Sequence, residues 1–543
     1  MSVKQNTVNK NSIKLIKHYI PEIVVLLRLI ISIVLLILAY KLDISTLVSI
    51  IMLILSALIT GLDTVISAVK SVIKGDYFNE NCLITVAAVA AFDAGCFAET
   101  VIFLAVFKLC AVMMKFVLKF AESTALELIP ADSKELYSKM RSKLSGKSRS
   151  EDVPPMKAAI FLAVKVACGV AVAFAVVMPL VSDMTFVMSV RRGAMLLAAM
   201  APVSMFASEN LISVIGHCFA SSYNVYVSDD KVFDSISELK TVAFDKNDVI
   251  TGGAVKISSI SSPMLDKDSF LMAAAYTVFN SEQPVSLPVI SAYNGEIVTD
   301  YVSSFTDIQG MGSEAVINGQ TMIFGTKELM DLRGIEIDAS HIKNGYVYYL
   351  AVSGRFAGSI TFKENINPYA EQTVSDLSDM GIDCVLISSD SDEISKKTAD
   401  ALNINKYYAG CDTMKKLHDV NSVKDEQEDD SCLMYISADS LDYHTDADID
   451  VKVGSISEVQ DISMSNIGIY GLPLITSVAR QMKYIKKRNI IISLAVKLLL
   501  VILALTGSAT LWFVVLLDYA AGMFCVLNTV EISNTITPKD EQL

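Results

Sequence analysis

Long apolar runs, separated by short polar connections, mark both ends of the chain. Several are close to the roughly 20 residues that a helix needs to cross a bilayer. We predict eight membrane spans, from apolar runs near 22–41, 45–67, 81–96, 97–119, 156–181, 190–222, 488–506 and 509–530. The third run is the shortest. Lys70 and Lys74 and a basic amino-terminal tail favour a cytosolic amino terminus, and an even number of spans then leaves both termini in the cytosol.

The polar segment 223–482 has a different pattern, in which strand-like and helix-like stretches alternate. The clearest are buried strands at 384–390 and 432–439 and amphipathic helices at 368–380 and 392–404. Such alternation is typical of a doubly wound parallel sheet. Between its halves, roughly at 261–358, a helix followed by short strands predicts an inserted α+β domain. The fold class is therefore an α-helical transmembrane bundle joined to a cytosolic α/β domain.

Composition agrees with a multi-pass membrane protein. Mean hydropathy is +0.47, and 19% of the 543 residues are charged. A net charge of -14 argues against nucleic acid as a partner. The nine cysteines form no Cys-x-x-Cys pair, so neither a zinc knuckle nor a disulfide framework is indicated.

One carboxylate stands where α/β proteins place their chemistry. Thr241 to Phe244 predict a short buried strand that ends on Asp245, and polar and glycine-rich residues follow at once. Open α/β sheets bind ligands at the carboxyl ends of their strands. Residues 245–251, Asp-Lys-Asn-Asp-Val-Ile-Thr, are similar to Asp-Lys-Thr-Gly-Thr-Leu-Thr, the phosphorylation motif of the P-type ATPases. The first, second and last positions match.

Around this motif, the chain resembles the heavy-metal-transporting class of that family, nearest the zinc, cadmium and lead exporters. The resemblance covers nearly the whole chain after residue 20, and the last two spans carry it most closely. It implies a haloacid dehalogenase-like phosphorylation domain with an inserted nucleotide-binding domain. It also implies ATP and Mg²⁺ as cofactors, a transported divalent cation such as Zn²⁺ or Cd²⁺, and membrane lipid as the surroundings.

The resemblance assigns roles in the phosphorylation domain. Asp245 matches the phosphorylated nucleophile, Lys416 the lysine that approaches the phosphate, and Ser388 the first residue of the family's Thr-Gly-Asp. Mg²⁺ would be held by Asp245, Asp439 and Asp442. Carboxylates, a metal and a lysine are what phosphoryl transfer requires. The alternative is that the fold has kept these charges in an inactive site.

Two substitutions within the motif weaken phosphate binding. Asp248 replaces a glycine beside the phosphate, and its negative charge repels the phosphate. Val249 replaces a threonine, which removes a hydroxyl that could donate to the phosphate. These changes favour an impaired site.

The nucleotide site keeps part of the family's pattern. Gln283 stands where the heavy-metal class has the histidine of Ser-Glu-His-Pro, and Val278 replaces an adenine-contacting glutamate. The Gly-x-Gly survives as Gly310 and Gly312, and Gly325 follows. We therefore expect ATP binding with weakened adenine contacts.

In the membrane, the family's metal ligands have changed. Its Cys-Pro-Cys becomes Ala-Pro-Val at 201–203, so the proline that breaks the helix remains and both soft thiolate ligands are gone. Lys497, Asp518 and Glu99 match the charged residues of the zinc and cadmium exporters and are assigned to the transport path. Intramembrane charges usually mark function. The alternative is a Lys497–Asp518 ion pair kept for folding.

The connection 121–155 lies where the family carries its actuator domain, whose Thr-Gly-Glu loop promotes hydrolysis of the aspartyl-phosphate. Thirty-five residues without Thr-Gly-Glu are too few for such a domain. A helix plus a linker is therefore the simpler interpretation.

These inferences divide the chain into nine segments. They are a cytosolic tail (1–20), spans one to four (21–120), the short connection (121–155), spans five and six (156–222), the first part of the phosphorylation domain (223–260), the nucleotide-binding domain (261–358), the second part of the phosphorylation domain (359–482), spans seven and eight (483–531) and a carboxyl-terminal tail (532–543).

The expected function is ATP-driven export of a divalent metal across the plasma membrane, impaired or lost in this chain. The alternative is a non-transporting pseudo-pump that binds nucleotide or partners in a regulatory role.

Overall fold

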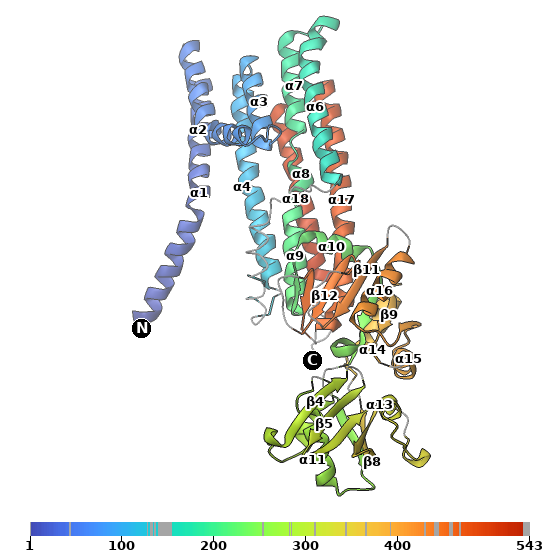
Figure 1. Ribbon diagram of the computed structural model, residues 1–543. Coiled ribbons are helices and arrows are strands. Elements are labelled where there is room, and N and C mark those ends of the chain that lie inside the picture. The colour runs from blue at the N-terminus through green and yellow to red at the C-terminus, as the bar shows by residue number, and fades with distance from the viewer. Residues whose placement is uncertain are drawn as a thin grey trace. The chain divides into compact units, whose positions relative to one another are not determined.

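The computed structural model describes the chain as two compact units (Figure 1). The first comprises Met1–Pro130, Ser142–Cys218 and Gln481–Leu543, and the second Ala131–Arg141 and Phe219–Arg480. The structure describes all residues except 1, 43, 44, 128, 131–133, 135, 136, 139–154, 252–254, 282, 284, 309, 310, 343, 344, 364, 365, 391, 428–430, 439–444, 455–459, 466, 467 and 536–543. The connection 121–155 therefore lies largely outside the described residues.

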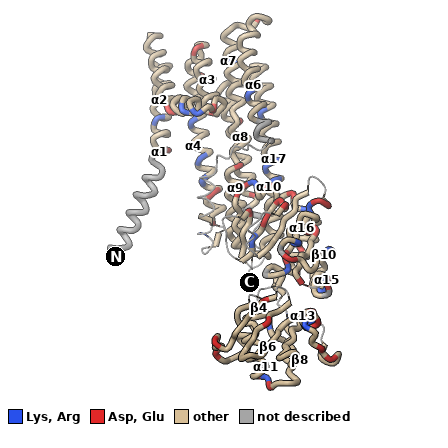
Figure 2. Tube along the Cα trace, viewed as in Figure 1, with Lys and Arg blue, Asp and Glu red and all other residues tan. Residues whose placement is uncertain are grey.

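The described part of the first unit is helical, as expected for a chain that crosses lipid, because a helix satisfies its own backbone polar groups. Its helices are α1 (Ser2–Lys41), α2 (Thr46–Ile73), α3 (Glu80–Asp93), α4 (Phe97–Glu127), α6 (Pro155–Val181), α7 (Phe186–Ala199), α8 (Val203–Phe206), α9 (Glu209–Ser222), α17 (Gly471–Thr506) and α18 (Leu511–Thr535). Of these, α9 and α17 extend a few residues into the second unit. Charged residues are sparse along them (Figure 2). The predicted helical membrane bundle is confirmed.

Seven helical stretches of the described chain are long and apolar enough to span a bilayer. The third predicted run, 81–96, forms α3, whose 14 residues fall short of the usual span. Its limits are local: the Asn79 side chain accepts a hydrogen bond from the Asn81 amide at the start, and Gly95 follows its end with a φ of +79°. Gly95 thus supplies the left-handed residue that ends a helix.

Polar side chains join the helices of the first unit. The Ser32 and Ser56 hydroxyls lie 2.6 Å apart between α1 and α2. Lys108 on α4 forms an ion pair of 2.9 Å with Asp63 on α2. Inter-helix hydrogen bonds of this kind hold membrane helices together where no hydrophobic force acts between them.

The second unit contains a seven-stranded sheet in the order β1-β13-β12-β11-β2-β9-β10, parallel except for β1 against β13. Its strands are β1 (Val225–Val227), β2 (Leu239–Asp245), β9 (Asp383–Ile387), β10 (Lys406–Tyr408), β11 (Cys432–Ser437), β12 (Ile449–Val453) and β13 (Ile462–Met464). The associated helices are α10 (Asp230–Ser237), α14 (Ala370–Asp379), α15 (Asp392–Ala401) and α16 (Thr413–Asp425). The predicted α/β domain is confirmed, with β2 in the interior of its sheet.

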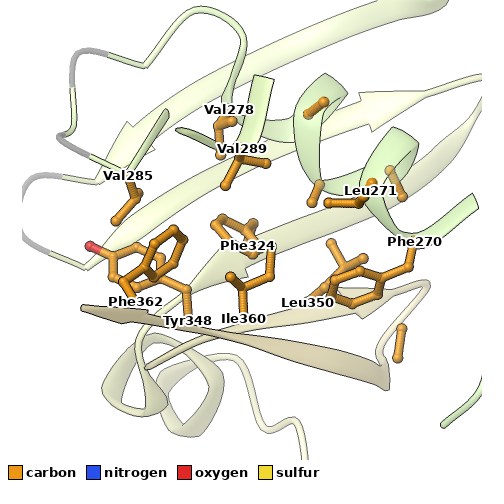
Figure 3. Packing of buried hydrophobic residues seen from close by; sticks show 14 residues of the cluster. Phe270, Leu271, Val278, Val285, Val289, Phe324, Tyr348, Leu350, Ile360 and Phe362 are labelled. Carbon is orange, nitrogen blue, oxygen red and sulfur yellow. The ribbon is translucent and has the colours of Figure 1, made fainter. Parts of the chain in front are cut away.

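A six-stranded antiparallel sheet, in the order β3-β8-β7-β6-β5-β4, interrupts this domain. Its strands are β3 (Lys256–Ser261), β4 (Val302–Ile308), β5 (Gly312–Ile317), β6 (Gln320–Gly325), β7 (Val347–Val352) and β8 (Arg355–Lys363), with helices α11 (Lys267–Val278), α12 (Ser286–Ala292) and α13 (Lys327–Leu332). The sheet begins at Lys256 and ends at Lys363, slightly beyond the range 261–358. Residues of α11, α12 and the sheet share one buried core (Figure 3).

Candidate functional site

Asp245 lies at the carboxyl end of β2, which pairs with β11 on one side and β9 on the other. Its side chain is 1% exposed. Oδ1 accepts a hydrogen bond from the Asn247 backbone amide at 3.3 Å, and Oδ2 lies 2.5 Å from the Lys416 ammonium. The structure therefore brings together the predicted nucleophile and the predicted lysine.

Lys416 reaches Asp245 from the first turn of α16. The side chain of Asp412 caps this helix by accepting a hydrogen bond from the Lys415 amide at 2.8 Å. The cap fixes the start of the helix and so the direction in which its first turn projects. The neighbouring Lys415 instead donates to the Ala409 carbonyl oxygen at 2.7 Å. Of the two adjacent lysines, Lys416 is thus the one at Asp245.

Ser388 lies beside the same strand end, because Ile387 is the register partner of Asp245. The Ser388 hydroxyl accepts a hydrogen bond from the Asp390 amide at 3.1 Å. The Asp390 carboxylate in turn lies 2.5 Å from the buried ammonium of Lys246. The sequence did not predict the pair of Lys246 and Asp390. Among the described residues, the site therefore holds two ion pairs, Lys416 with Asp245 and Lys246 with Asp390.

Tyr435 is a second residue that sequence reasoning missed. It is the register partner of Ala243, and its hydroxyl lies 3.5 Å from Asp245 Oδ2. Side chains two residues apart on a strand share a face, so Tyr435 and Asp245 face the same side. The only signal in the sequence was a polar aromatic residue inside a strongly apolar strand.

The predicted Mg²⁺ ligands are only partly described. Asp439, Asp442 and the side chain of Asp248 lie outside the described residues. Within the described residues, no group of three or more His, Cys, Asp or Glu side chains is placed to hold a metal. Asp245, the described member of the predicted set, has one carboxylate oxygen against Lys416. The described part of the site alone therefore does not make a magnesium site.

Gln283 lies in a dense hydrogen-bond network of the inserted domain. Its amide nitrogen lies 2.7 Å from Asp307 Oδ1, 3.0 Å from the Gly312 carbonyl oxygen and 3.1 Å from the Ile308 carbonyl oxygen. Its amide oxygen accepts from the Tyr348 hydroxyl at 3.2 Å. Burial raises the pKa of Tyr348, so this hydroxyl stays protonated and able to donate.

The two described glycines of the predicted nucleotide site face each other across β5 and β6. A Cβ on Gly312 would lie 2.3 Å from the Phe324 carbonyl oxygen, and one on Gly325 would lie 2.4 Å from the Met311 carbonyl oxygen. Close backbone packing therefore requires both glycines. Gly310 lies outside the described residues. Val278, in place of the family's glutamate, is part of the buried core (Figure 3).

In the membrane unit, Lys497 and Asp518 form a buried ion pair of 2.9 Å between α17 and α18. The Lys497 ammonium also donates to the carbonyl oxygens of Ala199 at 3.0 Å and Ala201 at 2.6 Å. These carbonyls lie at the break between α7 and α8, just before Pro202. Proline cannot donate a backbone hydrogen bond and ends the ladder there.

The Ser204 hydroxyl, on α8, donates to Asp518 at 2.7 Å. Asp518 therefore accepts hydrogen bonds from Lys497 and Ser204, and Lys497 donates to Asp518 and to two backbone carbonyl oxygens. The prediction that Lys497 and Asp518 lie together in the membrane agrees with this geometry, and Ser204 is an addition that the sequence did not suggest.

Glu99 has different partners. Its carboxylate accepts from the Arg191 guanidinium at 3.0 Å and from the Leu511 backbone amide at 3.0 Å. It thereby satisfies an amide at the first residue of α18 and ties α4 to α7. Arg191, which lies near the predicted outer face and fits the positive-inside rule poorly, has its counter-ion in Glu99.

Comparison with known proteins identifies the relatives of this chain. Residues 239–418 match a family of haloacid dehalogenase-like hydrolases. The chain is 26% identical to a zinc-transporting ATPase of Synechocystis sp. over 63% of its length and 49% of the relative. It is 27% identical to a cadmium, zinc and cobalt-transporting ATPase of Bacillus subtilis, over 63% and 50%. The chain thus spans about half the length of these curated relatives.

Solved structures agree on the fold. The crystal structure of a zinc-transporting PIB-type ATPase in its E2.Pi state has a TM-score of 0.58 at 16% identity, covering 93% of this chain and 99% of that one. A second crystal structure of a zinc-transporting PIB-type ATPase has a TM-score of 0.53. The curated relatives of this chain are thus zinc-, cadmium- and cobalt-transporting P-type ATPases, and its fold is similar to that of a zinc-transporting PIB-type ATPase.

Proposed function

We propose that this protein is a heavy-metal P-type ATPase-like membrane protein whose aspartyl-phosphate cycle is impaired, so that it does not sustain export of a divalent cation. The observation that carries the proposal is the state of Asp245. The carboxylate is 1% exposed, and its two oxygens face Lys416 and the Asn247 amide. An attacking carboxylate has to present an oxygen lone pair to the phosphorus atom. The ion pair with Lys416 makes Oδ2 a weaker nucleophile, while each oxygen keeps a second lone pair.

Charge supports the same proposal. In each of the two ion pairs of the site, Asp245 with Lys416 and Asp390 with Lys246, the lysine neutralises the charge of the aspartate. Mg²⁺ favours sites where carboxylate oxygens remain available to it. The chain would use ATP and Mg²⁺ as cofactors if the cycle ran, with Asp439 and Asp442 as further magnesium ligands.

The membrane unit supports it as well. Ala201 and Val203 cannot replace the two thiolates that soft cations prefer. The Lys497 ammonium already binds the carboxylate of Asp518 and the carbonyl oxygens of Ala199 and Ala201, just before Pro202. A divalent cation would have to displace this built-in positive charge. We place the protein in the plasma membrane, with both termini in the cytosol.

A second function is a pseudo-pump that binds nucleotide in a regulatory role. The observation that favours it is the ordered inserted domain, in which Gly312 and Gly325 still pack backbone against backbone. Both glycines match positions of the family's nucleotide-binding domain. Equilibrium binding of ATP to the purified full-length protein tests this function independently of transport.

The transport proposal is tested in sealed vesicles that hold the purified full-length protein. We expect no ATP-dependent uptake of Zn²⁺ or Cd²⁺ above that of the Asp245→Asn variant. Uptake that depends on ATP and disappears in Asp245→Asn would overturn the proposal. A working zinc exporter reconstituted in the same vesicles is the positive control.

A further inference from the structure

Tyr435 places a phenol hydroxyl beside Asp245, at a position that the sheet determines. Tyr435 lies on β11 and is the register partner of Ala243, which stands two residues before Asp245 on β2. Two residues of a strand cover about 6.6 Å, a distance that a tyrosine side chain leaning along its strand can bridge. The hydroxyl accordingly lies 3.5 Å from Asp245 Oδ2.

The ring of Tyr435 is fixed by a buried core cluster. The residue is 2% exposed, and its neighbours come from β2, β9, β11 and α16 and its approach. The cluster comprises Ala243, Val385, Ile387, Cys411, Val420, Val423, Leu433 and Tyr435. Close packing of this kind leaves a side chain few alternative positions. The hydroxyl therefore cannot move away from Asp245 without disturbing the core.

Lys416 and Tyr435 reach the same carboxylate oxygen, one from a helix and one from a strand. Lys416 lies four residues before Val420 on α16, so the two side chains share one face of the helix. Val420 packs in the cluster that holds Tyr435. The Lys416 ammonium lies 2.5 Å from Asp245 Oδ2. This oxygen is thus approached by both an ammonium and a phenol.

These two donors differ in what they can do during phosphoryl transfer. When a carboxylate attacks the γ-phosphorus of ATP, an O–P bond forms, the bond to ADP breaks with its electron pair, and the carboxylate loses negative charge. A donor that stabilises the free carboxylate more than the transition state slows this step. Lys416 has a long, flexible side chain that can follow the charge to the phosphate. The phenol of Tyr435 is held in the core and cannot.

We propose that Tyr435 is a positioning residue that retains Asp245 as a free carboxylate and so opposes the formation of an adduct on it. The inference rests on the proposed impairment of the aspartyl-phosphate cycle, and it names one residue that contributes to this impairment. Tyr435 lies on a different strand from the altered motif at 245–251, and it acts through Asp245 itself.

The test uses beryllium fluoride with Mg²⁺, which binds an aspartate carboxylate as a mimic of the acyl phosphate and requires no ATP. Fluorine NMR and calorimetry on the purified full-length protein measure its affinity. Tyr435→Phe keeps the ring in the core and removes the hydroxyl. Tyr408→Phe is the matched control, because Tyr408 packs against the same cluster but lies on β10, with β9 between it and β2. Asp245→Asn defines the background.

Tyr435→Phe should bind beryllium fluoride about fivefold more tightly than the wild type, the effect of one net hydrogen bond. Tyr408→Phe should bind as the wild type does, and Asp245→Asn should not bind. If Tyr435→Phe binds no more tightly than the wild type, or if neither binds, the proposal is overturned. The measurement involves no transport, so this proposal and the transport proposal can each fail while the other stands.

A spectroscopic readout separates a positioning role from a merely structural one. A phenol that donates to a carboxylate has a shifted near-ultraviolet absorption. The difference spectrum between the wild type and Asp245→Asn should therefore contain a tyrosine band, which should be absent when Asp245→Asn is introduced into Tyr435→Phe. The same tyrosine band in both backgrounds, or no band in either, would show that the phenol is not coupled to Asp245 and would overturn the proposal.

Hydrogen exchange guards against a misfolded variant. In Tyr435→Phe, amides of β2 and β11 should keep their protection, because the hydrogen bonds between these strands do not involve the Tyr435 side chain. If that protection is retained and beryllium fluoride still binds no more tightly than to the wild type, the proposal is wrong, and unfolding does not explain the result.

Discussion

At Asp245 a buried carboxylate is held by the Lys416 ammonium, the Asn247 backbone amide and the Tyr435 hydroxyl. Removing one partner of a buried ion pair leaves the other charge without compensation, which costs about 3–5 kcal/mol. The same reasoning applies to Lys416, which is 8% exposed. These two residues should therefore depend on each other more than on any other pair in the site.

We predict that Lys416→Met lowers the free energy of unfolding of the second unit by about 3 kcal/mol, and that adding Asp245→Asn restores part of it. The reason is that the double variant no longer buries a lone charge. Denaturant unfolding of the full-length protein, followed by hydrogen exchange in β2 and β11, measures the cycle. Additive effects of the two substitutions would contradict strong coupling.

Cys411 is a second residue with a clear chemical consequence. Burial, with the neighbouring Asp419 carboxylate, raises the pKa of its thiol from 9 to about 12. The thiolate is the form that reacts. The thiolate fraction falls about tenfold for each unit by which the pKa rises above the pH. At pH 8, a thiol with a pKa of about 12 therefore has about a thousandfold less thiolate than a thiol with a pKa of 9.

Cys411 should therefore resist iodoacetamide at pH 8 in the folded protein and react readily once denaturant has unfolded it. Mass spectrometry of the Cys411 peptide, with and without denaturant, gives both rates. In the folded state the labelling rate should rise as the pH is raised toward 12. Fast labelling of folded protein at pH 8 would show that the thiol is neither buried nor protonated.

At the scale of elements, the break between α7 and α8 organises the membrane unit. The helix α7 ends at Ala199, and the Lys497 ammonium from α17 donates to the carbonyl oxygens of Ala199 and Ala201 at this break, just before Pro202. Asp518 from α18 and Ser204 from α8 complete the cluster. The Lys497 side chain thus links α17 to α7 and α18, and we expect its loss to affect all three helices.

We predict that Lys497→Met destabilises the membrane unit more than Asp518→Asn does. Without Lys497, the buried Asp518 keeps Ser204, whereas without the Asp518 charge, Lys497 keeps two carbonyl acceptors. The difference should be about 1–2 kcal/mol, the scale of a hydrogen bond to a charged group.

Thermal unfolding in detergent ranks these variants. Leu498→Met is the matched neutral control, because Leu498 follows Lys497 on the same helix and its side chain is exposed rather than packed in the cluster. It should unfold as the wild type does. A larger effect of Asp518→Asn than of Lys497→Met would contradict this account.

The sequence predicted the elements of the α/β domain well, because strands such as 432–437 are continuous apolar runs and end on polar residues. The family resemblance assigned Lys497 and Asp518 to the transport path, and an ion pair between them was the alternative interpretation. The sequence predicted that Lys416 approaches Asp245, but it did not predict that Lys246 pairs with Asp390, because that pair joins residues on two different strand ends. Nor did it predict the network of Gln283, which joins residues far apart in the chain.

At the scale of the whole molecule, a pump has to couple phosphorylation, dephosphorylation and a cation site. The connection 121–155 is thirty-five residues long and has no Thr-Gly-Glu. We therefore predict that a phosphorylated Asp245 lacks the loop that activates water in the family. Loss of a general base slows a reaction by about 10²–10⁴-fold.

The last prediction follows from this missing step. Incubation of the purified full-length protein with labelled ATP and Mg²⁺ should give either no label or a long-lived label that withstands acid and is released by hydroxylamine, as an acyl phosphate is. Asp245→Asn should remove any such label. A cold chase with unlabelled ATP then measures its lifetime, since hydrolysis has to rely on unassisted water. A genuine Asp245 label that decays rapidly in the chase, in the absence of any added protein, would show that this chain contains a group that promotes dephosphorylation, and that the cycle is more complete than the site at Asp245 indicates.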